Sequence, residues 1–378
     1  MQPFKKPIYV TRPLLPSMEN YIDRMEDIWE SQWITNNGKQ HQKLEKELKD
    51  YLKVDNLSLI NNGTIALQIA LKALELEGEV ITTPFTFAAT PHAISWNGLK
   101  PVFCDIDPKT LNIDADKIED LITEKTSAIL AVHVFGTPCN VEKIKKIADK
   151  YDLKVIYDGA HAFGTEINET AIGNYGDITM YSFHATKLFN TIEGGALACS
   201  DSELKDKIEL LKNFGIKNEE EVVSIGTNGK MNEFQAAMGL EVLKKVEKER
   251  RKRKKIKKAY HNELKDIDGI NFIFESEFVK SSQQYLVIRI NEKEFGLSRD
   301  EVYKKLKKYN IFSRKYFYPL CSNYPCYSDV KSSNKVNLLT ANRVVDEVLS
   351  LPFYGALGIN NAKKISKIIK SFKENISD

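Results

Sequence analysis

The sequence has few cysteines, and they do not stand at spacings typical of metal sites or of a disulfide framework. The five cysteines lie at positions 104, 139, 199, 321 and 326, without a Cys-x-x-Cys pair and without histidines at zinc-type spacing. We therefore expect free thiols in a reducing cytoplasm and no metal site.

Long apolar runs are also missing. The chain has no stretch of about eighteen consecutive apolar residues. Its first residues, Met-Gln-Pro-Phe-Lys-Lys-Pro, lack the apolar core of a secretory signal. These features predict a cytoplasmic protein with no membrane partner.

A strong excess of one charge is absent, because the formal net charge is only +3. We expect no polyanionic partner, although a nucleotide-bearing substrate would not be repelled. The exception is a dense basic tract at residues 248–258. Nucleic-acid binding is one interpretation of this tract, but it continues a helical pattern with interspersed glutamate and no aromatic platform. We favour a solvated helix face.

The length of 378 residues suits two domains rather than one core. Short apolar strands alternate with helical patterns through the first part, which predicts an α/β domain with a mainly parallel sheet. The composition shift near the basic tract indicates a division into residues 1–245 and 246–378, the second being a small α+β domain. The expected strands are 57–60, 79–82, 100–104, 128–132, 154–157, 177–183 and 196–199, then 271–274 and 284–290 in the second domain; the expected helices include 65–74, 201–214, 298–308, 341–349 and 360–374.

One lysine stands between an apolar strand and a glycine turn, in the stretch from Tyr181 to Gly195. Desolvation at such a place can lower the pKa of an ammonium group until the neutral amine is available for Schiff-base chemistry. Lys187 is therefore the candidate catalytic residue. Taken alone it is also compatible with an ordinary surface charge.

A buried strand ending in an acid precedes this lysine by about thirty residues, in Lys154-Val-Ile-Tyr-Asp158. Ligands gather at the carboxyl ends of parallel strands, so we expect Asp158 to face a crevice, with a helix cap as the alternative. A lysine and a carboxylate in this arrangement are the pair that pyridoxal 5'-phosphate (PLP) requires, one for the aldehyde and one for the pyridine nitrogen. The pair is more specific than either residue alone.

A strand, glycine turn and helix at residues 57–74 provide a candidate phosphate site. The free N–H groups at that helix start suit an anion, and Gly63 and Thr64 occupy the turn. An ordinary strand-to-helix turn is the alternative. Phe87, just past another strand, is a candidate for stacking on a cofactor ring, although a core phenylalanine would look the same.

Near the N-terminus, residues 1–16 are expected to form an extended arm on another surface, followed by an amphipathic helix at 17–31 with a serine cap. Thr35 and Asn36 lie in a turn whose composition alone favours turn chemistry. Arg314 and Tyr316 belong to a basic and aromatic strip that suits a sugar nucleotide, with hairpin packing as an equal alternative.

Several spaced motifs resemble those of the DegT/DnrJ/EryC1/StrS family of PLP-dependent nucleotide-sugar aminotransferases, in the family's order and along nearly the full chain. The motifs are Asn62-Gly-Thr-Ile-Ala-Leu67, Thr83-Pro-Phe-Thr-Phe87, Pro101-Val-Phe-Cys-Asp105, Asp158-Gly-Ala-His161, Ser182-Phe-His-Ala-Thr-Lys187, Glu193-Gly-Gly195 and Asn228-Gly-Lys-Met-Asn-Glu-Phe-Gln-Ala-Ala237. Gly159 departs from the alanine of many relatives, and we expect it to alter local packing only.

The resemblance implies an aspartate-aminotransferase-like fold (PLP fold type I) with a seven-stranded sheet, and a homodimer with shared active sites. It implies that Lys187 forms the Schiff base and Asp158 pairs with the pyridine nitrogen. It further implies that Phe87 stacks on the ring and His161 contacts it. The phosphate would be held by Gly63, Thr64 and Ser182, joined by Asn228 of the other subunit.

The implied reaction is a ping-pong transfer from L-glutamate through pyridoxamine phosphate to a keto sugar, with Lys187 moving the proton. The sequence around Lys187 and Arg314 is most similar to that of enzymes making dTDP-4-amino-4,6-dideoxy-D-glucose from the 4-keto-6-deoxy sugar. Their product is used for O-antigen or other surface polysaccharide. A 3-aminotransferase of a dTDP-3-keto-6-deoxy sugar is the nearest alternative. A non-catalytic regulatory member would require a lost lysine or acid, and neither is lost. The expected substrate-binding residues are Thr35, Asn36, His184, Arg314 and Tyr316.

Overall fold

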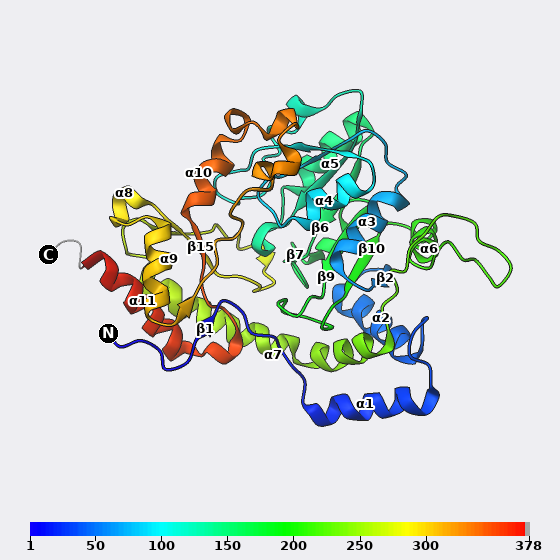
Figure 1. Ribbon diagram of the computed structural model, residues 1–378, viewed down its shortest axis with the longest axis horizontal. Helices are drawn as coiled ribbons and strands as arrows, with labels where there is room; N and C mark the ends of the chain where they lie inside the picture. The colour runs from blue at the N-terminus through cyan, green and yellow to red at the C-terminus, as the bar shows by residue number, and fades with distance from the viewer. Residues whose placement is uncertain (375–378) are drawn as a thin grey trace.

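The computed structural model describes residues 1–374, and its centre is a seven-stranded sheet (Figure 1). The strand order is β2-β10-β9-β6-β5-β3-β4. All neighbouring pairs are parallel except those of β10, which runs antiparallel to β9 and to β2. The expected seven-stranded, mainly parallel α/β sheet is therefore confirmed. The strands are β2 (Asn56–Ile60), β3 (Glu79–Thr82), β4 (Lys100–Phe103), β5 (Thr126–Val132), β6 (Lys154–Asp158), β9 (Ile178–Ser182) and β10 (Gly195–Cys199).

Both faces of this sheet are apolar, so alternate residues of one strand enter different cores. In β10, Leu197 packs with the helices on one face, whereas Ala196 and Ala198 pack with those on the other. In β5, Leu130 and Ile129 divide in the same way. One face is covered by α3 (Gly63–Ala73), α4 (Ala89–Trp96) and α6 (Ser202–Leu211), and the other by α2 (Lys39–Leu52), α5 (Val141–Tyr151) and the first half of α7 (Glu233–Leu264).

The C-terminal part has its own three-stranded antiparallel sheet with the order β11-β13-β15. The 32-residue helix α7 is continuous through the expected domain boundary and contributes to the cores of both parts. The division at residue 245 stays a prediction. The elements of this part are β11 (Ile270–Phe272), β13 (Val287–Ile290), β14 (Ile311–Phe312), β15 (Val348–Ser350), α8 (Glu292–Phe295), α9 (Arg299–Lys308), α10 (Leu339–Glu347) and α11 (Ile359–Glu374).

The expected strand at 284–290 begins three residues late, at Val287. Gln284 does not pair in the sheet; its backbone N–H donates to the hydroxyl of Ser282 at 3.3 Å. A small separate sheet joins β12 (Val279–Lys280), just before this segment, to β7 (Glu166–Ile167) and β8 (Thr170–Ala171).

The N-terminal arm lies along the C-terminal part (Figure 1). Its strand β1 (Ile8–Tyr9) pairs in parallel with β14. Helix α1 (Met18–Ser31) follows and packs on α7 through the buried Ile28. Ser17 stands at the N-cap position, but its side chain makes no capping hydrogen bond, so the expected serine cap is wrong in its chemistry.

None of the helices within residues 1–374 is long and apolar enough to cross a membrane.

Candidate functional site

A cavity of about 680 Å³ opens at the edge of the large sheet where β2, β6 and β9 end and β10 begins. This geometry follows from the strand directions, because parallel strands place their carboxyl ends at the same edge. Nine of the expected site residues line the cavity: Gly63, Thr64, Phe87, Asp158, His161, Ser182, His184, Lys187 and Tyr316.

Lys187 lies in the turn that joins β9 to β10. Its backbone N–H donates to the carbonyl of His184 at 2.8 Å, which closes the turn, and its side chain enters the cavity. Burial lowers the pKa of Lys187 to about 8, although the negative charge of Asp158 opposes this shift. A substantial fraction of the amine is therefore neutral near pH 8 and available as a nucleophile or base.

Asp158 is the last residue of β6 and is only 5 % exposed. One carboxylate oxygen accepts from the hydroxyl of Thr90 at 2.8 Å, and the other from the N–H of Ala160 at 3.0 Å. Burial raises the pKa of Asp158, whereas these hydrogen bonds and the charge of Lys187 act in the opposite direction. Asp158 does not cap the nearby helix α4, whose N-cap is Ala88, and instead lines the cavity as a buried acid.

The start of α3 presents free backbone donors to the cavity. The side chain of Asn62 caps the helix by accepting from the N–H of Ile65 at 2.9 Å. Within the described chain, the N–H groups of Gly63 and Thr64 donate to no protein acceptor. A Cβ at Gly63 would lie 3.2 Å from the hydroxyl oxygen of Ser182, so that hydroxyl stands directly beside the helix start. The arrangement suits an anion such as a phosphate.

His161 and Phe87 supply two rings. The N–H of Phe135 donates to Nδ1 of His161 at 3.3 Å, which leaves the proton of the neutral ring on Nε2. Burial and the charge of Lys187 lower the pKa of His161 well below its ordinary value, so the ring is neutral at pH 7. Phe87 also lines the cavity and is 63 % exposed, so much of its ring is accessible.

Four expected site residues do not line this cavity within one chain. Arg314 is exposed, and its backbone pairs with Ser350. Asn36 lines a different pocket with Lys230, and Thr35 lies beside it in the chain. Asn228 is exposed on the long connection between α6 and α7. The backbone of Arg314 pairs antiparallel with Ser350, the last residue of β15.

The model of the DegT/DnrJ/EryC1/StrS aminotransferase family matches residues 17–370. The chain belongs to this family. Similar relatives include the dTDP-4-amino-4,6-dideoxy-D-glucose transaminase of Shigella dysenteriae, 47 % identical over 98 % of this chain and 100 % of that protein. The transaminase of the same name from Escherichia coli is 48 % identical over 96 % of this chain and 98 % of that protein.

A similar solved structure is that of DesI in the presence of its TDP-sugar product. It has a TM-score of 0.94 and 34 % identity, over 99 % of this chain and 94 % of that one. The DegT family is PLP-dependent, and this chain's cavity has the groups that such a cofactor needs. Asp158 is a buried acid with no cationic side chain paired to it among residues 1–374, and unpartnered N–H groups face the same space. The residues therefore fit the cofactor.

The cavity of this aminotransferase also contains residues that the sequence pattern did not single out. The ring of Tyr285 lies 5.9 Å from Nζ of Lys187 and packs edge-on to the ring of His161 at 5.0 Å. Phe317 stacks on His161 at 5.6 Å. Neither residue follows a strand of the large sheet. Phe317 belongs to the basic and aromatic strip of Arg314 and Tyr316, whereas no local pattern indicates Tyr285.

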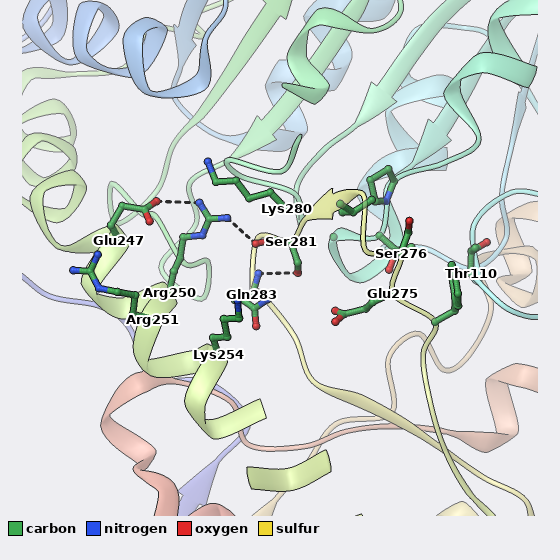
Figure 2. A pocket seen from close by; sticks show the side chains of 15 residues that line it. Thr110, Glu247, Arg250, Arg251, Lys254, Glu275, Ser276, Lys280, Ser281 and Gln283 are labelled. Atoms are coloured by element: carbon green, nitrogen blue, oxygen red, sulfur yellow. Dashed lines mark hydrogen bonds and ion pairs between the residues drawn. The ribbon is translucent and has the colours of Figure 1, made fainter. Parts of the chain in front are cut away.

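A second cavity of about 460 Å³ lies where α7 faces the segment around β12 (Figure 2). Part of the basic tract lines it. Arg250 and Arg253 are 6 % and 2 % exposed, so the expected solvated face is wrong for these residues. Both are buried because they bind backbone carbonyls and the carboxylates of Glu247 and Glu249. The neighbouring Arg251 and Lys254 are exposed, as expected.

Proposed function

We propose that this protein is a PLP-dependent aminotransferase that moves the amino group of L-glutamate to C4 of dTDP-4-keto-6-deoxy-D-glucose. The product would be dTDP-4-amino-4,6-dideoxy-D-glucose, a precursor for surface polysaccharide. The observation that carries the proposal is the position of Lys187 and Asp158 at one buried cavity, beside a helix start with free N–H groups. The high identity to two transaminases of that name supports the choice of sugar.

When bound, PLP supplies an electrophilic aldehyde and an electron-withdrawing ring. Asp158 would hold the ring nitrogen, and Gly63, Thr64 and Ser182 would hold the phosphate. Phe87 would cover one face of the ring, and Nε2–H of His161 is available to a ring oxygen. The neutral His161 adds no positive charge that would compete with the ring nitrogen for Asp158.

Lys187 would act as nucleophile and as proton carrier. Because burial lowers its pKa to about 8, its amine can accept a proton from a substrate carbon and return it at a neighbouring atom without a large energetic mismatch. Tyr285 and Phe317 pack beside Lys187 and His161 in the cavity wall.

We further propose that the enzyme works as a homodimer with shared sites. The exposed connection between α6 and α7 supports this, because it carries Asn228 together with the exposed apolar residues Val222, Val223 and Ile225. In Figure 1 this connection projects away from the body. Asn228 would then reach the phosphate of the other subunit. Thr35, Asn36, His184, Arg314 and Tyr316 are proposed to contact the sugar nucleotide, of which only His184 and Tyr316 line the cavity of one chain.

The test is spectroscopic. PLP bound to wild type should give a visible absorbance band that L-glutamate removes and dTDP-4-keto-6-deoxy-D-glucose restores. With Lys187→Ala, L-glutamate should not remove the absorbance of PLP in this way, and the keto sugar should restore nothing. Lys117→Met is the control, because Lys117 lies outside the cavity beside Asp105. NMR of the product distinguishes amination at C4 from amination at C3. Failure to bind PLP would overturn the proposal, and a band restored only by a 3-keto sugar would overturn the substrate.

A further inference from the structure

Within the turn that carries Lys187, one side chain from a distant part of the sequence, that of Gln284, forms hydrogen bonds on both sides of the lysine. Its amide oxygen accepts from the N–H of Leu188 at 2.6 Å, and its amide nitrogen donates to the carbonyl of Thr186 at 3.1 Å. Gln284 is only 3 % exposed. One side chain thus binds the peptide groups on both sides of Lys187.

This arrangement restricts the lysine backbone from both directions. The N–H of Lys187 itself is already bound to the carbonyl of His184. With the peptide groups of residues 186 and 188 also bound, the dihedral angles of Lys187 have little freedom, so the direction in which its side chain leaves the turn is defined. Without Gln284, the N–H of Leu188 would have no other partner among the described residues and would be buried unpaired.

The residues around Gln284, which we name the clamp segment (Ser281 to Tyr285), contact the other side of the cavity as well. The hydroxyl of Ser282 donates to the carbonyl of His161 at 2.7 Å. Tyr285 lies between the two, with its ring close to both Nζ of Lys187 and the ring of His161. A displacement of the segment would therefore move the lysine turn relative to the histidine.

Helix α7 holds the clamp segment from behind, on the side of the second cavity. Arg250 donates to the carbonyl of Ser281 at 2.7 Å, and Arg253 donates to the carbonyl of Gln283 at 3.3 Å. Figure 2 shows Arg250 between Glu247 and Ser281. The segment is therefore fixed on both sides, by arginines outside and by the lysine turn inside.

We propose that Gln284 is a positioning residue that orients Lys187 for proton transfer, through hydrogen bonds to the peptide groups on either side of it. The proposal rests on the proposed aminotransferase function for its catalytic consequence. Its structural content concerns the lysine turn alone and is measurable in protein without cofactor.

The experiment compares Gln284→Met with Gln40→Met in full-length protein. Methionine keeps the approximate volume and removes both hydrogen bonds. Gln40 is the matched control, because it is 2 % exposed and its amide also makes two side-chain hydrogen bonds, to Arg24 and Asp27, away from the cavity. Hydrogen exchange of the peptide containing Leu188, and labelling of Lys187 by an amine reagent across pH, are measured in cofactor-free protein.

In Gln284→Met we expect the backbone amide hydrogens of the lysine turn to exchange faster with solvent. We also expect the pH of half-maximal Lys187 labelling to shift upward from about 8, since a released lysine reaches solvent. In loaded enzyme, kcat should fall about a hundredfold while KM changes less. Gln40→Met should leave the turn and the labelling unchanged. The proposal would be overturned if both variants lost thermal stability equally while hydrogen exchange at the lysine turn and labelling of Lys187 stayed as in wild type.

Should Gln284→Met not fold, Gln284→Glu replaces it, because it keeps the shape and the bond from Leu188 and loses the donor to Thr186. An unchanged lysine turn in that variant would overturn the proposal equally. If wild type bound no PLP, the proposed function would fail while the exchange and labelling results would still decide the role of Gln284.

Discussion

At the scale of single residues, Lys187 is energetically unusual, because its ammonium group is buried and makes no salt bridge among residues 1–374. The folded state lowers its pKa from 10.5 to about 8. Below about pH 8 the ammonium group is charged in the folded and in the unfolded state. The free energy of unfolding is then reduced by the full desolvation of the buried charge. As pH rises from about 8 to 10.5, the unfolded state binds more protons than the folded state, so stability rises and the cost disappears.

Lys187→Met in cofactor-free protein should therefore be more stable than wild type at pH 7, by about 3 kcal/mol. The gain should shrink as pH rises through 8 and approach zero near 10.5. Urea unfolding of both proteins at pH 7 and pH 10 measures this. A gain of equal size at both pH values would contradict a lowered lysine pKa.

Gly63 provides a second prediction at this scale. A Cβ there would lie 3.1 Å from Cβ of Ser182 and 3.2 Å from its hydroxyl oxygen, at the helix start proposed to hold a phosphate. Gly63→Ala should weaken PLP binding about tenfold by moving Ser182, while stability changes by less than about 1 kcal/mol because alanine suits a helix. Fluorescence titration with PLP measures the affinity, and a thermal melt measures the stability. Unchanged affinity would argue against a phosphate at this position.

The sequence pattern led to Lys187 and Asp158 because each stands where a strand of a parallel sheet ends, which is a local feature. Gln284 and Tyr285 act on the same cavity from about 100 positions away along the chain. Their contacts depend on how the chain returns to the sheet, and no local periodicity contains that information. Asn228 came from family resemblance and Arg314 from a basic and aromatic strip, and one chain alone leaves both outside the cavity.

At the scale of elements, strand boundaries were predictable wherever an apolar run ended in a polar or glycine residue. β3 and the helix α9 match the expected residues closely. The exceptions have physical reasons. Gln284 and Tyr285 look like strand but contact the lysine turn instead. Arg250 and Arg253 look like solvent-facing cations but bind the carbonyls of Ser281 and Gln283.

Helix α7 provides a prediction through its buried ion pair. Nε of Arg253 binds Glu249 at 2.9 Å, and both side chains are nearly inaccessible. Arg253→Met leaves the carboxylate of Glu249 buried without this cation and should destabilise the protein by about 3 to 5 kcal/mol. Arg251→Met, two residues away and exposed, should change stability by less than about 0.5 kcal/mol. Equal urea midpoints for the two variants would show that the pair does not stabilise the fold.

The connection between α6 and α7 provides the other prediction at this scale. Ile225 is 87 % exposed, with Val222 and Val223 close by in the chain. If this segment covers a second subunit, Ile225→Glu should convert a dimer to monomers by placing a charge in an apolar interface. Analytical ultracentrifugation measures the mass, with Ile359→Glu, exposed at the start of α11, as the control. A dimer of unchanged affinity would place the interface elsewhere.

For the whole molecule, thiol reactivity reports the integrity of the fold. Cys104, Cys139, Cys199 and Cys321 are buried, and Cys326 is exposed. Burial raises the pKa of Cys199 to about 11 and that of Cys321 to about 12, so these thiols are also poor nucleophiles. A thiol reagent should modify one cysteine quickly in native protein and all five in denaturant. Fast native modification of more than one would indicate local opening of a core.

The overall organisation followed from the alternation of strands and helices, since that alternation alone predicts a covered, mainly parallel sheet. The strand order did not follow from it. Nothing in the local sequence indicates that β10 enters between β9 and β2 in the opposite direction. That insertion depends on the short turn containing Lys187, which brings the chain back beside β9 without a crossover helix.

The insertion of β10 also determines when the protein can acquire its shape during synthesis. β2 is completed at residue 60, but β10, its neighbour in the sheet, ends at Cys199. Well over a hundred further residues must leave the ribosome before that edge is covered. Until then the Asn62-Gly63 turn and the Lys187 turn belong to separate parts of the nascent chain, so the cavity that both line cannot form.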